Sequence, residues 1–175
     1  MKKGQVWIET VIYTLVGLGL IGVVLAFITP KINEYRDRVV IDQTIQSLNV
    51  VDAKASEVLQ APLNTRVVEF TLKRGTLTLN ATNETIFYTL EDSHVIYSEP
   101  DEVTNIGRIA VLTKEGKKTH TVTLGLSYSF DLDYQDNGTA RVYSAAATPY
   151  KFSFEHRGFS SQGKPIVFFR ELSGA

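Results

Sequence analysis

The sequence predicts an α+β protein, with a long N-terminal helix followed by an antiparallel β-sandwich or barrel-like domain. The first observation is an uncharged, mostly apolar stretch over residues 10–29. The second is a helical spacing of apolar residues that continues to Gln60. The third is a change after Pro62 to short segments in which apolar and polar residues alternate, a pattern typical of strands.

The composition limits the classes of protein to consider. The chain has 175 residues, a formal net charge of −1 and no cysteine. This length suits one membrane segment and one globular domain. The near-neutral charge gives no support for nucleic-acid binding, which requires a basic surface. Without cysteine the chain has no disulfide framework and no thiolate metal site.

The apolar stretch 10–29 is long enough to cross a bilayer. A helix of roughly 20 residues spans about 30 Å. A secretory signal has a shorter apolar core of about 7–15 residues, followed by a cleavage site. We therefore expect a retained transmembrane helix, with cleavage near residues 25–27 as the alternative.

The helix is expected to continue beyond the membrane segment. Apolar residues recur there at spacings of three and four, which places them in one stripe on a helix. They are Ile41, Ile45, Leu48, Val51, Ala55 and Val58. Pro62 disfavours helical geometry in Ala61 and should end the helix. Pro30 lies inside the pattern, where it either marks the membrane boundary or introduces a bend.

The remainder is predicted to form about ten short strands. The expected strands are 67–73, 76–80, 85–90, 94–98, 108–113, 119–124, 127–134, 139–144, 150–156 and 165–171. Arg74-Gly75 is expected to join the first two, and Asn137-Gly138 favours a tight hairpin between residues 127–134 and 139–144. The apolar run 166–169 is expected to be buried on both faces, because an exposed edge of this kind invites aggregation.

The residues before the apolar stretch form a distinctive motif. Lys2, Lys3 and Gly4 lead through Gln5 to Glu9, which directly precedes the stretch. A carboxylate costs about 2.5–3.5 kcal/mol near the bilayer centre and less toward its edge, so its presence there indicates a use. The arrangement resembles the N-terminus of type IV pilins, in the short-leader form of archaeal pilins and archaellins. Trp7 departs from that pattern, which commonly has a serine at this position.

The resemblance implies a role for each of these residues. A membrane peptidase would cut after Gly4, so that Gln5 becomes the N-terminus and Glu9 the fifth mature residue. Lys2 and Lys3 would hold the leader on the cytoplasmic side. In the family, the glutamate is thought to pair with the N-terminal amine of a neighbouring subunit. Glu9 would then act in assembly.

The expected organisation follows from this resemblance. Residues 1–4 would be the leader, 5–29 the transmembrane and assembly helix, 30–61 its amphipathic continuation and 62–175 an extracellular β-rich domain. The implied function is a structural subunit of an extracellular type IV pilus-like filament for adhesion or surface attachment. Its partners would be further copies of itself, a prepilin-type peptidase and membrane assembly machinery. It would reside in the cell membrane before assembly and in a surface filament afterwards.

Two alternatives stay open. The chain could be a membrane-tethered extracellular β domain that binds a ligand without polymerising. It could also be a subunit of an archaellum-type motility filament.

Other motifs give weaker indications. Asn80, Asn83 and Asn137 each begin an Asn-x-Thr triplet, the acceptor pattern for N-glycosylation. The acidic cluster near Asp133 does not match an EF-hand, because Ser144 occupies the position of the bidentate glutamate. We therefore expect a solvated loop and no metal.

No motif in the chain indicates an enzyme. His94, His120 and His156 are far apart in the sequence and have no short ligand spacing. No phosphate-binding loop or nucleophile elbow is present. We expect no catalytic activity and no cofactor.

Overall fold

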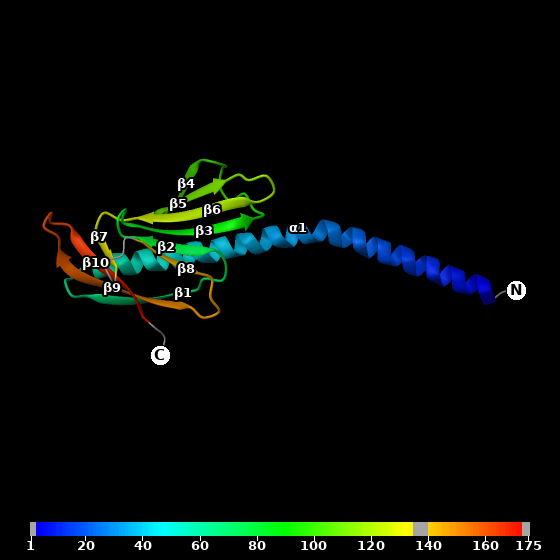
Figure 1. The fold of residues 1–175 in the computed structure, drawn as a ribbon, viewed down its shortest axis with the longest axis horizontal. Coiled ribbons are helices and arrows are strands. Elements are labelled where there is room, and N and C mark those ends of the chain that lie inside the picture. The colour runs from blue at the N-terminus through cyan, green and yellow to red at the C-terminus, as the bar shows by residue number, and fades with distance from the viewer. Residues whose placement is uncertain (1–2, 135–139, 173–175) are drawn as a thin grey trace. The chain divides into compact units, whose positions relative to one another are not determined.

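The computed structural model describes residues 3–134 and 140–172, with side chains from Trp7 onward (Figure 1). Helix α1 (Lys3–Val58) precedes ten strands within these ranges. The strands are β1 (Thr65–Phe70), β2 (Thr76–Asn80), β3 (Thr85–Ser93), β4 (Val103–Ile106), β5 (Ile109–Lys114), β6 (His120–Ser127), β7 (Asp131–Tyr134), β8 (Ala140–Ser144), β9 (Tyr150–Phe159) and β10 (Pro165–Leu172). The chain divides into two compact units, Met1–Arg36 and Asp37–Ala175.

Helix α1 confirms the predicted long helix. It ends at Val58, two residues before the predicted end at Gln60 and ahead of Pro62. It runs without interruption through Pro30, although proline cannot donate the backbone hydrogen bond expected there. The Thr29 hydroxyl donates to the Leu25 carbonyl at 2.7 Å in this region. Pro30 therefore does not end the helix.

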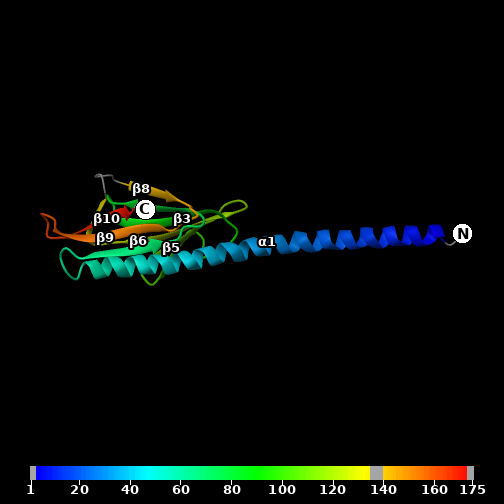
Figure 2. The ribbon, with the colours of Figure 1, turned by 90° about the horizontal axis from the view of Figure 1, so that it is seen from below.

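The strands form two sheets, and the α+β class is confirmed. The larger sheet has the order β4-β5-β6-β3-β2-β8, and all of its neighbouring strands are antiparallel. The smaller sheet has the order β1-β9-β10-β7, in which only β10 and β7 run parallel. Residues 37–58 of α1 run alongside these sheets in both ribbon views (Figures 1 and 2).

The predicted hairpin between residues 127–134 and 139–144 is wrong, and the strands on either side of Arg74-Gly75 do not pair with each other. β1 and β2 do not form a hairpin, because β1 pairs with β9 in the smaller sheet and β2 pairs with β3 and β8 in the larger. β7 and β8 likewise lie in different sheets. Alternation determines which side chains face inward, but it does not determine which strand lies alongside. Strands that follow each other in the sequence are therefore not always neighbours in a sheet.

Residues 94–98 are not a strand, and β4 was not predicted. Three backbone N–H groups in the 94–98 segment bind side chains instead of a neighbouring strand. The N–H of His94 donates to Asp37 at 2.7 Å, and that of Ser98 donates to the Thr113 hydroxyl at 3.0 Å. β4 escaped prediction because all four of its residues are exposed and no alternation marks it.

The core confirms the apolar stripe of the helix. Ile41, Leu48, Ala55 and Val58 are all fully buried, and the whole stripe belongs to one cluster with residues of both sheets. Tyr143 of the larger sheet meets Phe152 of the smaller one edge-on, with ring centroids 5.0 Å apart. Helix and sheets therefore share a single hydrophobic core in the unit Asp37–Ala175.

The apolar run 166–169 lies mostly inside, as predicted. Val167, Phe168 and Phe169 are buried, and β10 has a strand on each side. Phe168 points to the opposite face from its two neighbours. There the guanidinium of Arg157 covers its ring at 3.4 Å from the centroid, a cation–π contact.

Candidate functional site

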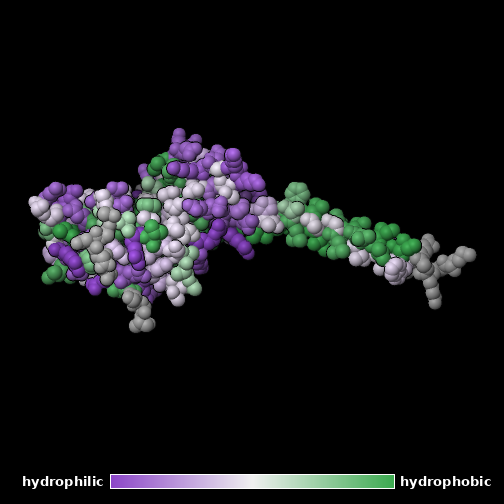
Figure 3. Space-filling view, viewed as in Figure 1, coloured by the Kyte–Doolittle hydropathy of each residue, from purple (hydrophilic) through white to green (hydrophobic). Residues whose placement is uncertain are grey.

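The N-terminal unit is a helix whose apolar side chains are exposed on all sides. Within the described residues, one helix is long and apolar enough to cross a membrane, and none of its most apolar window is buried. Figure 3 shows this segment in the colour of hydrophobic residues. The exposed large side chains of this unit are Trp7, Ile8, Val11, Ile12, Tyr13, Leu15, Val16, Leu18, Leu20, Ile21, Val23, Val24, Leu25, Phe27, Ile28, Ile32 and Tyr35. Such a surface indicates membrane anchoring or a secretion signal.

Glu9 lies on this apolar helix. Its side chain is exposed, and Trp7 and Ile8 beside it are 73% and 59% exposed. Lys3, Gly4 and Gln5 form the beginning of α1, and Lys2 lies outside the described residues. Cleavage after Gly4 and pairing of Glu9 with an amine stay predictions.

The second half of α1 is held to the β domain at Asp37, which is only 1% exposed. One carboxylate oxygen accepts a hydrogen bond from the Arg74 guanidinium. The other accepts the backbone N–H of His94 at 2.7 Å and contacts the His94 ring Nδ1 at 3.0 Å. Burial alone would raise the pKa of Asp37. The hydrogen bonds from His94 and Arg74 outweigh it and hold this pKa below its usual range.

Two more acidic residues along the helix bind the β domain. Asp42 accepts a 2.6 Å hydrogen bond from the hydroxyl of Tyr97. Burial, together with the Asp42 carboxylate, raises the pKa of that hydroxyl to about 12, so it stays a donor at neutral pH. Asp52 accepts a 2.9 Å bond from Arg108, whose guanidinium also lies over the ring of Tyr128.

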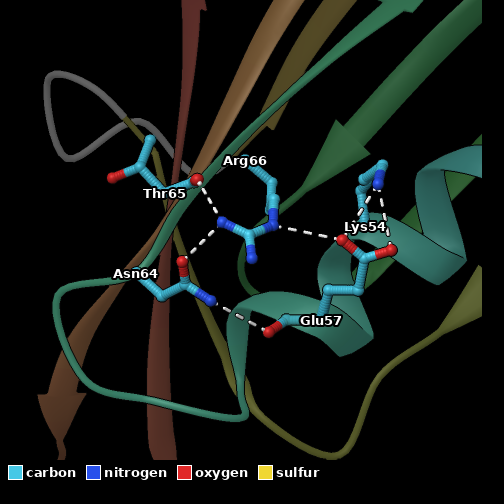
Figure 4. Close-up of polar contacts among 5 residues, drawn as sticks. All are labelled: Lys54, Glu57, Asn64, Thr65 and Arg66. Atoms are coloured by element: carbon cyan, nitrogen blue, oxygen red, sulfur yellow. Dashed lines mark hydrogen bonds and ion pairs between the residues drawn. The ribbon is translucent and has the colours of Figure 1, made fainter.

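A fourth contact lies at the end of the helix (Figure 4). Glu57 binds Lys54 at 2.9 Å and Arg66 of β1 at 3.1 Å. Asn64 donates to the Glu57 carbonyl at 3.2 Å, which satisfies one of the carbonyls left free at a helix C-terminus. Arg66 also donates to the Asn64 side chain at 2.6 Å. The loop is thereby fixed to the helix end.

We call Asp37, Asp42, Asp52 and Glu57, with their partners on the β domain, the acidic clamp. Sequence reasoning did not find it, because the partners of Asp37, Asp42 and Asp52 lie 37 to 57 residues away. The usable signal was that four acids flank the buried stripe on a helix that must pack against strands. The clamp and the stripe together fix residues 37–58 to the domain.

The glycosylation motifs lie in different surroundings. Asn80 ends β2, and its side-chain oxygen accepts the backbone N–H groups of Thr82 and Asn83 at 3.0 and 3.1 Å. Asn83 is exposed in the same turn. Asn137 lies outside the described residues.

The histidines and acidic residues do not gather into one site. His94 binds Asp37, whereas buried His156 contacts the Gly158 carbonyl through Nε2 at 3.1 Å. Asp131 forms an ion pair with Lys164, and Asp136 lies outside the described residues. Within the described ranges, no group of three or more histidine, aspartate or glutamate side chains is placed to hold a metal ion.

The chain matches no protein-family model, no curated protein and no solved structure. Its architecture is pilin-like, because a long apolar N-terminal helix precedes mostly antiparallel β-sheets.

Proposed function

We propose that this chain is a structural subunit of an extracellular type IV pilus-like filament used for adhesion or surface attachment. A peptidase removes residues 1–4, and membrane machinery assembles the processed subunits through their N-terminal helices. The protein resides in the cell membrane before assembly and in the filament afterwards. The proposal assigns it no catalytic role and no cofactor.

The observation that carries the proposal is the contrast within α1. Residues 37–58 bury one stripe and engage the β domain through the acidic clamp. In the preceding unit, large apolar side chains are exposed around the helix. A segment with no polar side requires lipid or other apolar helices around it. A bundle of identical helices supplies such surroundings outside the membrane.

Glu9 fixes the axial offset between neighbouring helices in this assembly. Once Gln5 is the N-terminus, its ammonium group is four residues from Glu9 in the same chain and is free to meet Glu9 of a neighbour. In an apolar bundle, an unpaired carboxylate is costly, and pairing with an amine offsets that cost. Assembly therefore favours the one axial offset between helices at which the two charges meet.

The test is Glu9→Gln, which keeps the size of the side chain and removes its charge. We expect surface filaments to be lost while the protein accumulates in the membrane with a folded β domain. Glu34→Gln is the matched control, because Glu34 lies on the same helix in an exposed ion pair with Lys31. Filaments should persist in this control. Normal filaments in the Glu9→Gln strain would overturn the assigned role.

The alternatives predict different results. A tethered, non-polymerising domain would give processed protein in the membrane and none in filaments from wild-type cells. A motility filament would show as loss of swimming, with surface attachment retained, when the gene is deleted. The proposed adhesion filament predicts loss of attachment.

A further inference from the structure

The outer face of the larger sheet carries no charge over most of its width. In β2, β3, β5 and β6, the residues of this face alternate with buried ones, whereas all residues of β4 are exposed. Cross-strand pairing places the residues of the face in three rows. We call these rows the neutral face. The first contains Ala140, Asn80, Thr85 and Ser127; the second contains Val142, Thr78, Phe87, Gly125, Ala110 and Asn105; the third contains Ser144, Thr76, Thr89, Thr123, Leu112 and Val103.

The smaller sheet shows that this lack of charge is local. The side of that sheet bearing Phe168 carries Glu155, Arg157 and Arg170, and the two arginines lie within 3.9 Å of the Glu155 carboxylate. About a quarter to a third of a soluble protein's surface is ordinarily charged. The neutral face therefore differs both from the other sheet and from an ordinary surface. Depletion of charge is typical of surfaces that are covered.

One of the acceptor motifs lies at the edge of this face. Asn80 belongs to its first row, between Ala140 on one side and Thr85 on the other. Its Oδ1 is held by two backbone N–H groups of the following turn. Because the amide is planar, Nδ2 lies on the side away from those groups. Among the described residues, Nδ2 donates no hydrogen bond that would compete with its modification.

Asn80 is a better acceptor than its neighbour Asn83. A transferase must bind the threonine hydroxyl of the triplet as well as the asparagine. Thr82, which completes the Asn80 triplet, is exposed in the turn. Thr85, which completes the Asn83 triplet, is part-buried and paired on both sides within the sheet. Asn80 is part-buried and Asn83 is exposed, so the feature that favours Asn80 is its threonine, which lies outside the sheet.

We infer that Asn80 carries an N-linked sugar chain that lies over the neutral face, with its first sugars against Phe87. The donor class is a lipid-phosphate-linked oligosaccharide. The C1–O bond to the lipid phosphate breaks, a bond forms between C1 and Nδ2, and one Nδ2 proton passes to a base of the transferase. The lipid phosphate leaves. This inference rests on the part of the proposed function that exports the β domain.

The chemistry of the face suits a neutral sugar. Threonine hydroxyls both donate and accept hydrogen bonds, as sugar hydroxyls do. A ring face carries negative charge density that attracts the polarised C–H groups of a sugar, and Phe87 is part-exposed for this contact. Without charged side chains, covering the face leaves no ion desolvated.

The geometry brings Phe87 within reach of a sugar on Asn80. Asn80 pairs with Thr85, and Phe87 is two residues further on the same face. The diagonal separation is then about 7–8 Å. Gly125, paired with Phe87 across the next strand, has no side chain, and an added Cβ there would have no atom nearer than 4.0 Å. The ring therefore borders open space on that side.

The first experiment measures the intact mass and glycopeptides of the full chain, recovered from the membrane fraction of its native cells. Asn80→Gln should remove the sugar mass, and the matched Asn83→Gln should retain it. An unmodified Asn80, or a sugar on Asn83 alone, would overturn the inference. Because the membrane fraction is used, a glycosylated but unpolymerised protein would contradict the proposed filament and support this inference. Filaments without sugar would support the proposed filament and contradict this inference.

The second experiment tests where the sugar lies. We expect the sugar-bearing protein to unfold about 2–4 °C higher than a Thr82→Ala variant, which corresponds to roughly 1 kcal/mol in a domain of this size. Thr82→Ala removes the acceptor triplet and keeps both hydrogen bonds to Asn80 Oδ1, because they come from backbone N–H groups. This difference should disappear when both are compared in a Phe87→Thr background. Comparing within each background removes the direct effect of Phe87→Thr on folding. An undiminished difference would overturn the contact with Phe87.

Discussion

The two halves of α1 have the same backbone conformation but different surroundings. In Met1–Arg36, large apolar side chains are exposed around the helix. In residues 37–58, one apolar stripe is buried and four acids bind the β domain. One continuous helix therefore combines a segment that needs apolar surroundings with a segment that already has them. The comparison shows that helix formation and helix burial are separate properties of this sequence.

The largest expected effect is the loss of stability on shortening a buried side chain in the second half of α1. Leu48→Ala should destabilise the β domain by about 2–5 kcal/mol, because Leu48 is fully buried and its loss leaves a cavity. Leu18→Ala, at a residue 61% exposed, should leave domain unfolding unchanged. The measurement is denaturant unfolding of the full chain in detergent. Equal losses in both variants would show that the N-terminal half also contributes to the domain core.

The next effect concerns the most buried member of the acidic clamp. Asp37→Asn should cost about 1–3 kcal/mol, because it weakens a charged hydrogen bond to Arg74 in a site only 1% exposed. The same unfolding measurement applies. Glu69→Gln, which breaks an ion pair with Lys151 that is exposed on both sides, should cost at most about 0.5 kcal/mol. An Asp37→Asn variant as stable as the wild type would show that the Asp37 charge does not stabilise the domain.

The pH dependence of stability sharpens that result. In the unfolded chain the pKa of Asp37 is near 3.9, and in the folded state it is held below that value. The contribution of the Asp37 carboxylate to stability is therefore fully present above about pH 4. That contribution is lost as the pH falls through the folded-state pKa. Unfolding free energies measured from pH 7 down to pH 2 should decline less steeply in Asp37→Asn than in the wild type. Part of the decline in stability should persist in Asp37→Asn, because ion pairs with Lys54 and Arg66 also lower the pKa of Glu57. Identical profiles would contradict the assignment.

The smallest effect is expected at Arg108. It binds Asp52 at 2.9 Å and lies over the Tyr128 ring, but its own side chain is 54% exposed. Arg108→Ala should therefore cost only about 0.5–1 kcal/mol by denaturant unfolding. Arg108→Lys keeps the charge without the planar contact to the ring. Its free energy of unfolding should lie between those of the wild type and Arg108→Ala. A loss greater than that of Asp37→Asn would reverse the proposed order within the clamp.

The sequence predicted those features that depend on local spacing. The long helix, its stripe from Ile41 to Val58 and most strand positions follow from periodicity and turn residues. The strand partners of β1, β2, β7 and β8 did not follow, because alternation encodes the inward face and not the neighbour. Residues 94–98 looked like a strand, but their backbone groups bind Asp37 and Thr113 instead.

The candidate sites divide in the same way. The run from Lys2 to Glu9 and the triplet at Asn80 are contiguous in sequence and were visible in it. The acidic clamp was not, because it forms only when residues such as Asp37 and His94 meet across 57 positions. The neutral face was also hidden, since its rows depend on the register between six strands.

The most direct measurement is the intact mass and N-terminal sequence of the protein in sheared surface filaments and in the membrane fraction. We expect the filaments to contain this chain beginning at Gln5. A chain that begins at Met1 and occurs only in membranes would contradict it.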